Sequence, residues 1–263
     1  MSLQLDQRRR AMLAEMGIRV VEPPHRAAEV ATPSPRPSAR RADDNPAPAG
    51  PPPRAVEAVA RERPAPAALE PRPAGVELMS WDELAQAVAG CRACKLCAGR
   101  RNTVFGVGDA QADWLIVGEA PGENEDLQGE PFVGPAGQLL DNMLKALGLD
   151  RRHKVYIANV LKCRPPGNRN PQPEEVAQCE PFLRRQVQLL QPRIILAMGR
   201  FAVQSLLGTT EPIGKLRGRA YQYLGVPVVV TYHPAYLLRN LPDKAKAWAD
   251  LCLAQALVRD QQA

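Results

Sequence analysis

The sequence predicts an α/β fold: a three-layer α/β/α domain with a central, mainly parallel four-stranded sheet, preceded by a disordered N-terminal extension rich in Pro, Ala and Arg. Four short apolar runs lack the polar alternation of half-exposed strands, which is typical of parallel strands buried on both faces. Helical stretches separate these runs, and repeated strand–helix units imply helices on both faces of the sheet. The predicted strands are 114–118, 155–159, 193–198 and 227–231, and the predicted helices are 135–147, 174–190, 200–207 and 242–259.

The chain ahead of this domain is predicted to lack a core. Fourteen of the 27 prolines fall between Pro23 and Pro73, among Ala and Arg and almost no large apolar residues. Such a segment buries too little apolar surface to offset the entropy lost on ordering. The expected organisation is a short amphipathic helix over 1–22, a disordered linker over 23–75 and a globular domain over 76–263. Residues 3–21 either dock on a protein partner or form a helix without one.

Charge and cysteine content narrow the setting in which the protein works. The formal net charge is +6 and the pI is near 9.1, which favours a polyanionic partner such as nucleic acid. No apolar run reaches the roughly 18 residues of a membrane span, and the N-terminus lacks a secretory signal. We therefore expect a cytoplasmic monomer without a membrane partner. In a reducing compartment, clustered cysteines are better explained as metal ligands than as disulfides.

A further helix is predicted to begin after Ser80 and to lead the chain to its first cysteines. Ser80 is a suitable N-cap residue, and Asp82 and Glu83 in the first turn suit the helix dipole. This helix brings the chain to Cys91.

Four cysteines are spaced as ligands of one metal or cluster. They are Cys91, Cys94, Cys163 and Cys179, of which the first two form a C-x-x-C pair. Four thiolates suit either a structural zinc ion or an iron–sulfur cluster. Cys97 extends the pair to C-x-x-C-x-x-C and competes for a ligand position, whereas Cys252, between two leucines, is expected to pack in the core.

Two motifs follow predicted strands. Gly118–Gly122 (GEAPG) begins as the strand 114–118 ends, and His233–Tyr236 (HPAY) follows the strand 227–231. The carboxyl ends of parallel strands are where open α/β sheets bind their ligands. The two motifs are therefore expected to form two sides of one site.

These motifs, with several others in the same order, resemble the family 4 uracil-DNA glycosylases. The resemblance covers about residues 80–258. The blocks that carry it are Cys91–Cys94 (CRAC), Val104–Gly108 (VFGVG), Gly118–Asp126 (GEAPGENED), Pro131–Leu140 (PFVGPAGQLL), Tyr156–Pro166 (YIANVLKCRPP), Asn168–Arg169 and His233–Asn240 (HPAYLLRN). One such block would be weak evidence, but this many ordered blocks are specific.

The resemblance implies an enzyme of DNA repair whose partner is uracil-containing DNA. Such an enzyme flips uracil out of DNA and hydrolyses its N-glycosidic bond, which leaves an abasic site. The resemblance also implies a [4Fe–4S] cluster, with zinc the less favoured alternative, and it gives Cys97 no ligand role. The implied ligands are Cys91, Cys94, Cys163 and Cys179. The cluster would organise loops that face DNA and take no part in bond cleavage.

Three side chains are implied to handle the base. Asn159 matches the residue that reads the Watson–Crick edge, because an amide offers both a donor and an acceptor. Phe132 matches the residue that stacks on uracil, although its residue type alone would indicate core packing. His233 matches the residue that stabilises negative charge on the leaving base.

The glycine-containing loop is expected to lie near the base and the attacking water. Gly118 allows the backbone to approach closely because it has no Cβ. Ala120 stands where family 1 enzymes carry a water-positioning aspartate, so Glu119, the backbone or another polar group must position the water. Gly122 stands where family 1 has a tyrosine that excludes the thymine methyl group. The candidates for that exclusion are Glu125 and Glu123.

The residues after the histidine are candidates for gripping DNA. Leu237 or Leu238 can fill the gap left by a flipped base, and Arg239 can contact a phosphate. Further phosphate candidates are Lys162, Arg164, Arg169 and Lys215.

Two other functions remain open. A related group binds uracil-DNA covalently through a histidine in a basic loop, but the corresponding loop here, Cys163–Pro173, has no histidine. A non-catalytic DNA-binding or polymerase-associated module would leave Asn159, Phe132 and His233 without a role. Hydrolysis is therefore the favoured function.

Overall fold

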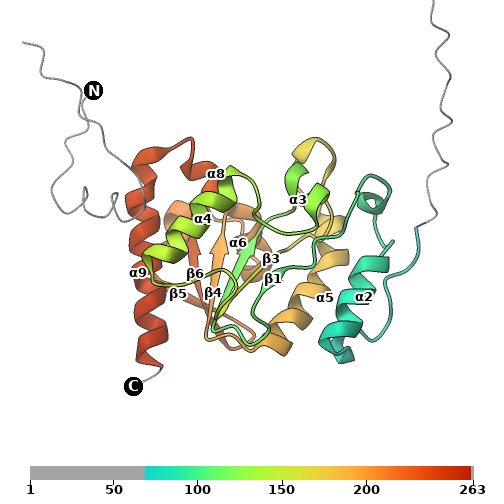
Figure 1. Cartoon of the computed structure of the whole chain (residues 1–263), viewed down its shortest axis with the longest axis horizontal. Helices are drawn as coiled ribbons and strands as arrows, with labels where there is room; N and C mark the ends of the chain where they lie inside the picture. The colour runs from blue at the N-terminus through green and yellow to red at the C-terminus, as the bar shows by residue number, and fades with distance from the viewer. Residues whose placement is uncertain (1–68, 262–263) are drawn as a thin grey trace, which may run out of the picture. The chain divides into compact units, whose positions relative to one another are not determined.

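A six-stranded sheet forms the centre of the structure, a computed structural model that describes residues 69–261 (Figure 1). The strand order is β1-β3-β2-β4-β6-β5. Four inner strands are parallel: β2 (Trp114–Gly118), β3 (Val155–Asn159), β4 (Ile194–Met198) and β6 (Val226–Thr231). They coincide with the four predicted strands, because continuous apolar runs are what strands covered on both faces require.

Two edge strands extend the sheet beyond the four that the sequence predicts. β1 (Val107–Gly108) pairs antiparallel with β3, and β5 (Ala220–Tyr223) pairs antiparallel with β6. β1 has only two residues, and the side chains of β5 alternate between exposed and half-buried. Neither strand presents an apolar run, so the prediction of four strands was incomplete at both edges.

Helices cover both faces of the sheet, which confirms the three-layer α/β/α prediction (Figure 1). One buried cluster joins α4 (Pro135–Ala146) and α9 (Lys244–Asp260) to one face of the sheet. A second cluster joins α5 (Pro173–Leu190) and α6 (Arg200–Leu207) to the other face. The core divides in this way because successive side chains of a strand point to opposite faces.

The remaining described elements are shorter or lie at the rim of the sheet. They are η1 (Val76–Leu78), α2 (Trp81–Gly90), η2 (Lys95–Ala98), α3 (Glu123–Gln128), η3 (Pro166–Asn168), α7 (Ile213–Leu216), α8 (Pro234–Leu237) and η4 (Leu241–Asp243). α2 begins as predicted: the Ser80 hydroxyl accepts a hydrogen bond from the Glu83 N–H, and the Glu83 carboxylate accepts one from the Ser80 N–H at 2.8 Å. This reciprocal capping fixes where the helix starts.

The N-terminal predictions fall almost wholly outside the described residues. These are the helix over 1–22 and most of the linker over 23–75. Residues 69–75 are described and form an irregular segment, in which the Glu70 N–H donates to the Arg92 carbonyl at 3.2 Å. The first helical turn after them is η1.

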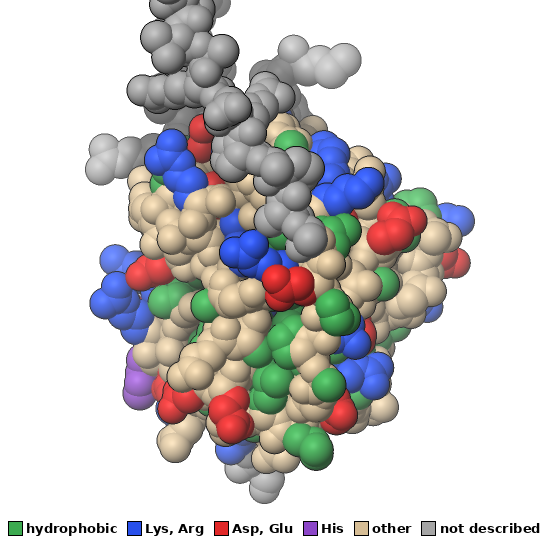
Figure 2. Space-filling model, turned by 90° about the vertical axis from the view of Figure 1, so that its right-hand side faces the viewer, with side chains coloured by type: hydrophobic (Ala, Val, Ile, Leu, Met, Phe, Trp, Pro, Cys, Tyr) green, Lys and Arg blue, Asp and Glu red, His purple; other side chains and the backbone are tan. Residues whose placement is uncertain are grey.

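The surface shows mixed charge. Figure 2 views the side on which α2 lies in Figure 1, and its visible Lys and Arg side chains are interspersed with Asp and Glu. That face therefore carries no uniformly basic patch. None of the helices within residues 69–261 has the length and apolar character needed to cross a membrane.

Candidate active site

A cavity of about 740 Å³ opens at the carboxyl ends of the four parallel strands. Its walls come from the loops that follow β2, β3, β4 and β6, so the end of the sheet brings together segments far apart in sequence. The predicted site residues that line it are Glu119, Ala120, Phe132, Asn159, His233 and Arg239. Residues of both motifs therefore line one cavity.

Asn159 lines the cavity, and Gly118 lies beside it. They are paired in register as the last residues of β3 and β2. The Asn159 side chain is buried, and within the described part of the chain its Oδ1 atom has no hydrogen-bond partner. A Cβ on Gly118 would overlap that Oδ1 and would lie 2.7 Å from the Phe132 ring. Glycine is therefore required here, and Asn159, a buried amide with an unsatisfied acceptor, is part of the cavity lining.

His233 is held in one tautomer by the helix that follows it. It is the N-cap residue of α8, and its Nδ1 accepts a hydrogen bond from the Ala235 N–H at 3.1 Å. A nitrogen that accepts carries no proton, so the proton of the neutral ring lies on Nε2. Burial lowers the pKa of His233 to about 4, which keeps the imidazole neutral at physiological pH. The ring can thus donate from Nε2 without carrying a charge.

Phe132 lies beside this histidine on a strained backbone. The two rings stack with their centroids 5.3 Å apart and their planes at 24°. Phe132 has a φ of 55°, a left-handed conformation that costs a bulky residue about 1–3 kcal/mol. Glu125 of α3 braces the loop by accepting hydrogen bonds from the Val133 N–H at 3.0 Å and the Gly134 N–H at 3.4 Å. Its other oxygen accepts from the Gly122 N–H at 3.1 Å, so Glu125 joins the two loops of the site.

Glu119 carries the ionisable carboxyl group of the GEAPG loop. Burial raises its pKa to about 7, and the nearby Arg200 guanidinium partly opposes this shift. Ala120 next to it offers no polar group, as predicted. Arg200 also lines the cavity, as the first residue of α6, and the sequence prediction did not include it. The available signal was the same as for the other motifs, because Gly199-Arg200 directly follows a buried strand.

Two predicted DNA contacts need correction. Leu237 is 0% exposed and packs in the cluster beneath α4 and α9, so it cannot fill a gap in DNA, whereas the adjacent Leu238 is 42% exposed. The reason is helical geometry: in α8, neighbouring residues point in different directions. Lys162 is 1% exposed, and its ammonium group donates to the Asn159 carbonyl and to the Gln186 side chain at 2.9 and 2.6 Å. It therefore supports the fold and cannot reach a phosphate.

The other charged candidates are paired to different extents. Arg169 forms a two-point ion pair with Glu175, at 2.9 and 2.5 Å. Arg164 lies 3.5 Å from the Glu123 carboxylate, which directs Glu123 toward the surface. Arg239 is exposed at the rim of the cavity, where its side chain can meet solvent or a phosphate.

The four predicted cysteine ligands lie near one another, and none of them lines the cavity. Cys163 and Cys179 are buried with Leu96 and Leu161, and Cys94 packs against this cluster. Burial is the main cause that raises the pKa of both buried thiols, and negative charge on Cys94 raises it further, so the three thiols interact electrostatically. Cys91 likewise raises the pKa of Cys94 and Cys163. The Arg100 guanidinium donates to the Cys163 sulfur at 3.0 Å and stabilises a thiolate there.

The arrangement of these thiols bears on which metal group they can hold. Within residues 69–261, no three Cys, His, Asp or Glu side chains converge on the position of a single ion. Cys97 is half-buried and adds to the charges acting on Cys94. Cys252 is exposed on α9, so the prediction that it packs in the core was wrong.

The sequence is similar to those of several known proteins. Residues 105–252 match the sequence model of the Uracil DNA glycosylase superfamily. The chain is 46% identical to a type-4 uracil-DNA glycosylase of Archaeoglobus fulgidus over 167 residues, 60% of this chain and 83% of that protein. It is 46% identical to a type-4 uracil-DNA glycosylase of Thermotoga maritima over 165 residues, 62% of this chain and 85% of that protein. A type-5 uracil-DNA glycosylase of Pyrobaculum aerophilum is 30% identical over 193 residues, with 61% and 84% of the two chains covered.

Proposed function

The chain belongs to the Uracil DNA glycosylase superfamily. We propose that it excises uracil from DNA in this cavity, as the names of its type-4 uracil-DNA glycosylase relatives indicate. The observation that carries the proposal is the convergence of Asn159, Phe132 and His233 on one cavity. The products are free uracil and an abasic site in the DNA, the starting point of base excision repair.

Recognition of the base is assigned to Asn159 and Phe132. The unsatisfied Oδ1 of Asn159 accepts a hydrogen bond from the uracil N3–H, and the amide NH₂ donates to O4. Phe132 stacks on the face of the flipped ring. Cytosine presents an acceptor at N3 and a donor at N4, so both hydrogen bonds would be lost with that base.

Bond cleavage is assigned to His233 and Glu119. As the N-glycosidic bond breaks, negative charge develops on uracil and positive charge on the sugar. The Nε2–H of the neutral His233 donates to uracil O2 and stabilises the leaving anion. The carboxylate of Glu119 orients the attacking water and stabilises the cationic sugar, beside the small side chain of Ala120. Gly118 leaves room for the Asn159 amide and the Phe132 ring that bind the base. Glu125, beside Gly122, occupies the space that a thymine methyl group would need.

A [4Fe–4S] cluster is proposed on Cys91, Cys94, Cys163 and Cys179, because four thiolates are its usual ligands. The electrostatic interactions among these thiols support their grouping around one such cluster. Such a group would supply rigidity to the connected loops, and the Arg100 guanidinium would hydrogen-bond one of its ligands.

The grip on DNA is assigned to residues at the rim. Arg239 contacts a phosphate, and Leu238 rather than Leu237 faces the DNA. We further propose that the protein works as a cytoplasmic monomer, a setting that keeps thiolates reduced and contains DNA. Residues 3–21 remain a proposed docking segment for a protein partner, and residues 76–263 the catalytic domain.

The test uses the full chain and an oligonucleotide with a single uracil. After incubation, hot alkali cleaves the strand wherever a base has been removed. We expect cleavage at the uracil position and none in a matched thymine oligonucleotide. Binding without cleavage would support the non-catalytic module, and a protein–DNA adduct that survives denaturant would support the covalent binder.

A further inference from the structure

The ring proposed to stack on uracil depends on a backbone that its own residue type disfavours. Phe132 lies in the left-handed region, at a φ of 55°. A bulky residue remains there only where surrounding contacts fix it. The contacts of this loop therefore decide where the aromatic ring lies in the cavity.

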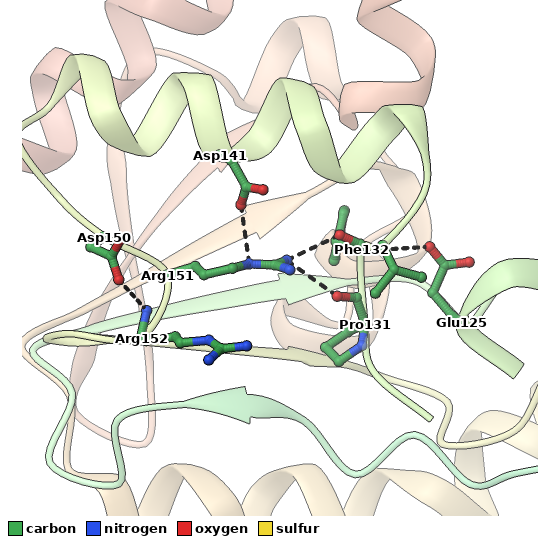
Figure 3. A network of polar contacts seen from close by, with 8 residues as sticks. Glu125, Pro131, Phe132, Asp141, Asp150, Arg151 and Arg152 are labelled. Carbon is green, nitrogen blue, oxygen red and sulfur yellow. Dashed lines mark hydrogen bonds and ion pairs between the residues drawn. The ribbon is translucent and has the colours of Figure 1, made fainter. Parts of the chain in front are cut away.

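Two oppositely charged side chains bind the backbone of the Phe132 loop: Glu125 accepts from its N–H groups and Arg151 donates to its carbonyl groups (Figure 3). Arg151, in the turn between α4 and β3, supplies the matching cation. Its Nη2 donates to the Phe132 carbonyl at 3.0 Å and to the Pro131 carbonyl at 3.3 Å. Together the two side chains satisfy the loop backbone on either side of the ring.

Arg151 is itself oriented by helix α4. Its Nε lies 3.0 Å from Oδ1 of Asp141, an ion pair whose geometry falls outside that of a hydrogen bond. Because the guanidinium contacts both Asp141 of α4 and the Phe132 carbonyl, it lies between the helix and the loop. The Arg151 side chain is 18% exposed and that of Asp141 is 45% exposed. α4 also approaches the same peptide through Gly137, where a Cβ would overlap the Phe132 carbonyl oxygen.

We propose that Arg151 is a positioning residue for uracil excision, which fixes the peptide of Phe132 and thereby the plane of the stacking ring. Arg151 does not line the cavity, so it acts through Phe132 and not on the base. The inference rests on the proposed function, because it concerns the ring that this function assigns to uracil.

Arg152 provides a matched control. It is the next residue in the chain and has the same side chain, but that side chain is exposed. Its backbone N–H, which a substitution retains, donates to Asp150 at 2.8 Å (Figure 3). Arg151→Ala and Arg152→Ala thus remove the same charge from neighbouring positions, and only the first removes contacts to the loop.

The experiment is a double-mutant cycle on the full chain, measured as single-turnover excision of uracil. We expect Arg151→Ala to slow excision by about 10- to 100-fold and Arg152→Ala by less than about twofold, because small displacements of a positioning group carry large rate penalties. In a Phe132→Ala background, Arg151→Ala should slow excision by no more than about twofold further, because residues that act through one another are not additive. An equal effect with and without the ring would overturn the proposal, as would equal activity of the two arginine variants.

A conservative substitution of Asp141 tests the same contact in case Arg151→Ala does not fold. Asp141 is partly exposed, so Asp141→Asn is expected to fold, and thermal unfolding of each variant checks this. Asp141→Asn should slow excision less than Arg151→Ala does. This effect, too, should be seen only when Phe132 is present. If Arg151→Ala fails to fold, the same cycle with Asp141→Asn decides, and an effect of that variant independent of the ring rejects the proposal.

Binding separates this proposal from the proposed function. The probe is an oligonucleotide with 2′-fluoro-2′-deoxyuridine, whose fluorine disfavours the cationic sugar and slows cleavage. If the wild-type protein binds this probe more tightly than a thymidine control but excises no uracil, the enzymatic function alone is rejected. Arg151→Ala should then still weaken that preference, and Arg152→Ala should not. A preference that survives Arg151→Ala unchanged would reject the positioning role alone.

Discussion

At the scale of single residues, burial acts on two ionisable groups of one cavity and separates their roles. It raises the pKa of Glu119 to about 7 and lowers that of His233 to about 4. Both shifts favour the neutral form, because burial penalises charge. Near neutral pH, however, only Glu119 titrates, while His233 remains an uncharged donor.

The pH dependence of excision follows from this separation. If the Glu119 carboxylate orients water, single-turnover rates should rise about tenfold per pH unit below pH 7 and level off above it. Glu119→Gln should be slower at high pH and should lose this dependence, since it has no proton to release. A Gln variant that keeps the same pH dependence would assign the titration to another group.

His233 should contribute mainly to the chemical step. His233→Ala removes the donor to the leaving base, and we expect the single-turnover rate to fall by about 10²–10³-fold, as for loss of one oxyanion donor. The remaining activity should keep the rise toward pH 7, because that rise belongs to Glu119. His153→Ala, at an exposed position, is the control and should excise uracil at the wild-type rate. Unchanged activity of the His233 variant would contradict the assigned role.

At the scale of elements, each motif works because a strand or helix terminus aims it. β2 and β3 end in register at Gly118 and Asn159, and the start of α8 fixes the tautomer of His233. The same short helix sends Leu237 into the core and Leu238 to the surface. Of these two adjacent leucines, Leu237 therefore contributes to stability, and Leu238 is available for binding.

This division gives a prediction for two leucine variants. Leu237→Ala should lower the free energy of unfolding by about 2–5 kcal/mol, because it opens a cavity in the core. Leu238→Ala should leave the free energy of unfolding within about 0.5 kcal/mol of the wild-type value. Leu238→Ala should instead weaken binding to uracil-containing DNA. Chemical denaturation and fluorescence anisotropy measure the two effects, and a stability loss in the Leu238 variant would contradict the assignment.

The cysteine region offers a second test at this scale. Cys163→Ser should remove the iron and the visible absorption of a [4Fe–4S] cluster from anaerobically purified protein, and should lower its unfolding temperature. Cys97→Ser and Cys252→Ser should retain both the iron and the colour. Loss of iron in the Cys97 variant would place that residue among the ligands. Protein that binds zinc and no iron would reject the cluster.

At the scale of the whole molecule, the described residues contain an extensive buried core. Every buried hydrophobic residue in residues 69–261 lies between Val76 and Val258. The two clusters on either side of the sheet, the smaller cluster beneath α2 and the cluster around Cys163 and Cys179 make up most of this core. The fold is thus held by contacts among these residues.

Removal of residues 1–68 retains all of these core residues, and we predict that it leaves the domain intact. We expect the truncated protein to unfold at the wild-type temperature and to excise uracil within about twofold of the full-length rate. Calorimetry and the alkali-cleavage assay measure these quantities. A large loss of stability would show that the N-terminal residues add to the core, and a loss of excision alone would give them a role in DNA binding.

Much of the fold could be predicted because its signals are local. The inner strands are continuous apolar runs, and Ser80 and Glu83 indicate the start of α2. The edge strands escaped prediction because β1 has two residues and β5 is half-exposed. Glu119, Asn159 and His233 were predictable because each lies at or just after the end of a buried strand, whereas Phe132, between α3 and α4, was predicted only from the family resemblance. Arg200 also follows a buried strand but has no distinctive motif.

By itself, the sequence determined the parallel sheet, the positions of its site loops and the family to which the chain belongs. These depend on residue types and on short-range order along the chain. Only the tertiary structure decided which atoms face one another: the free Oδ1 of Asn159, the acceptor Nδ1 of His233 and the peptide of Phe132 under Arg151. It also decided which of two adjacent leucines reaches the surface. The physical reason is that burial, hydrogen-bond partners and pKa depend on neighbours brought together by folding, and spacing along the chain does not specify them.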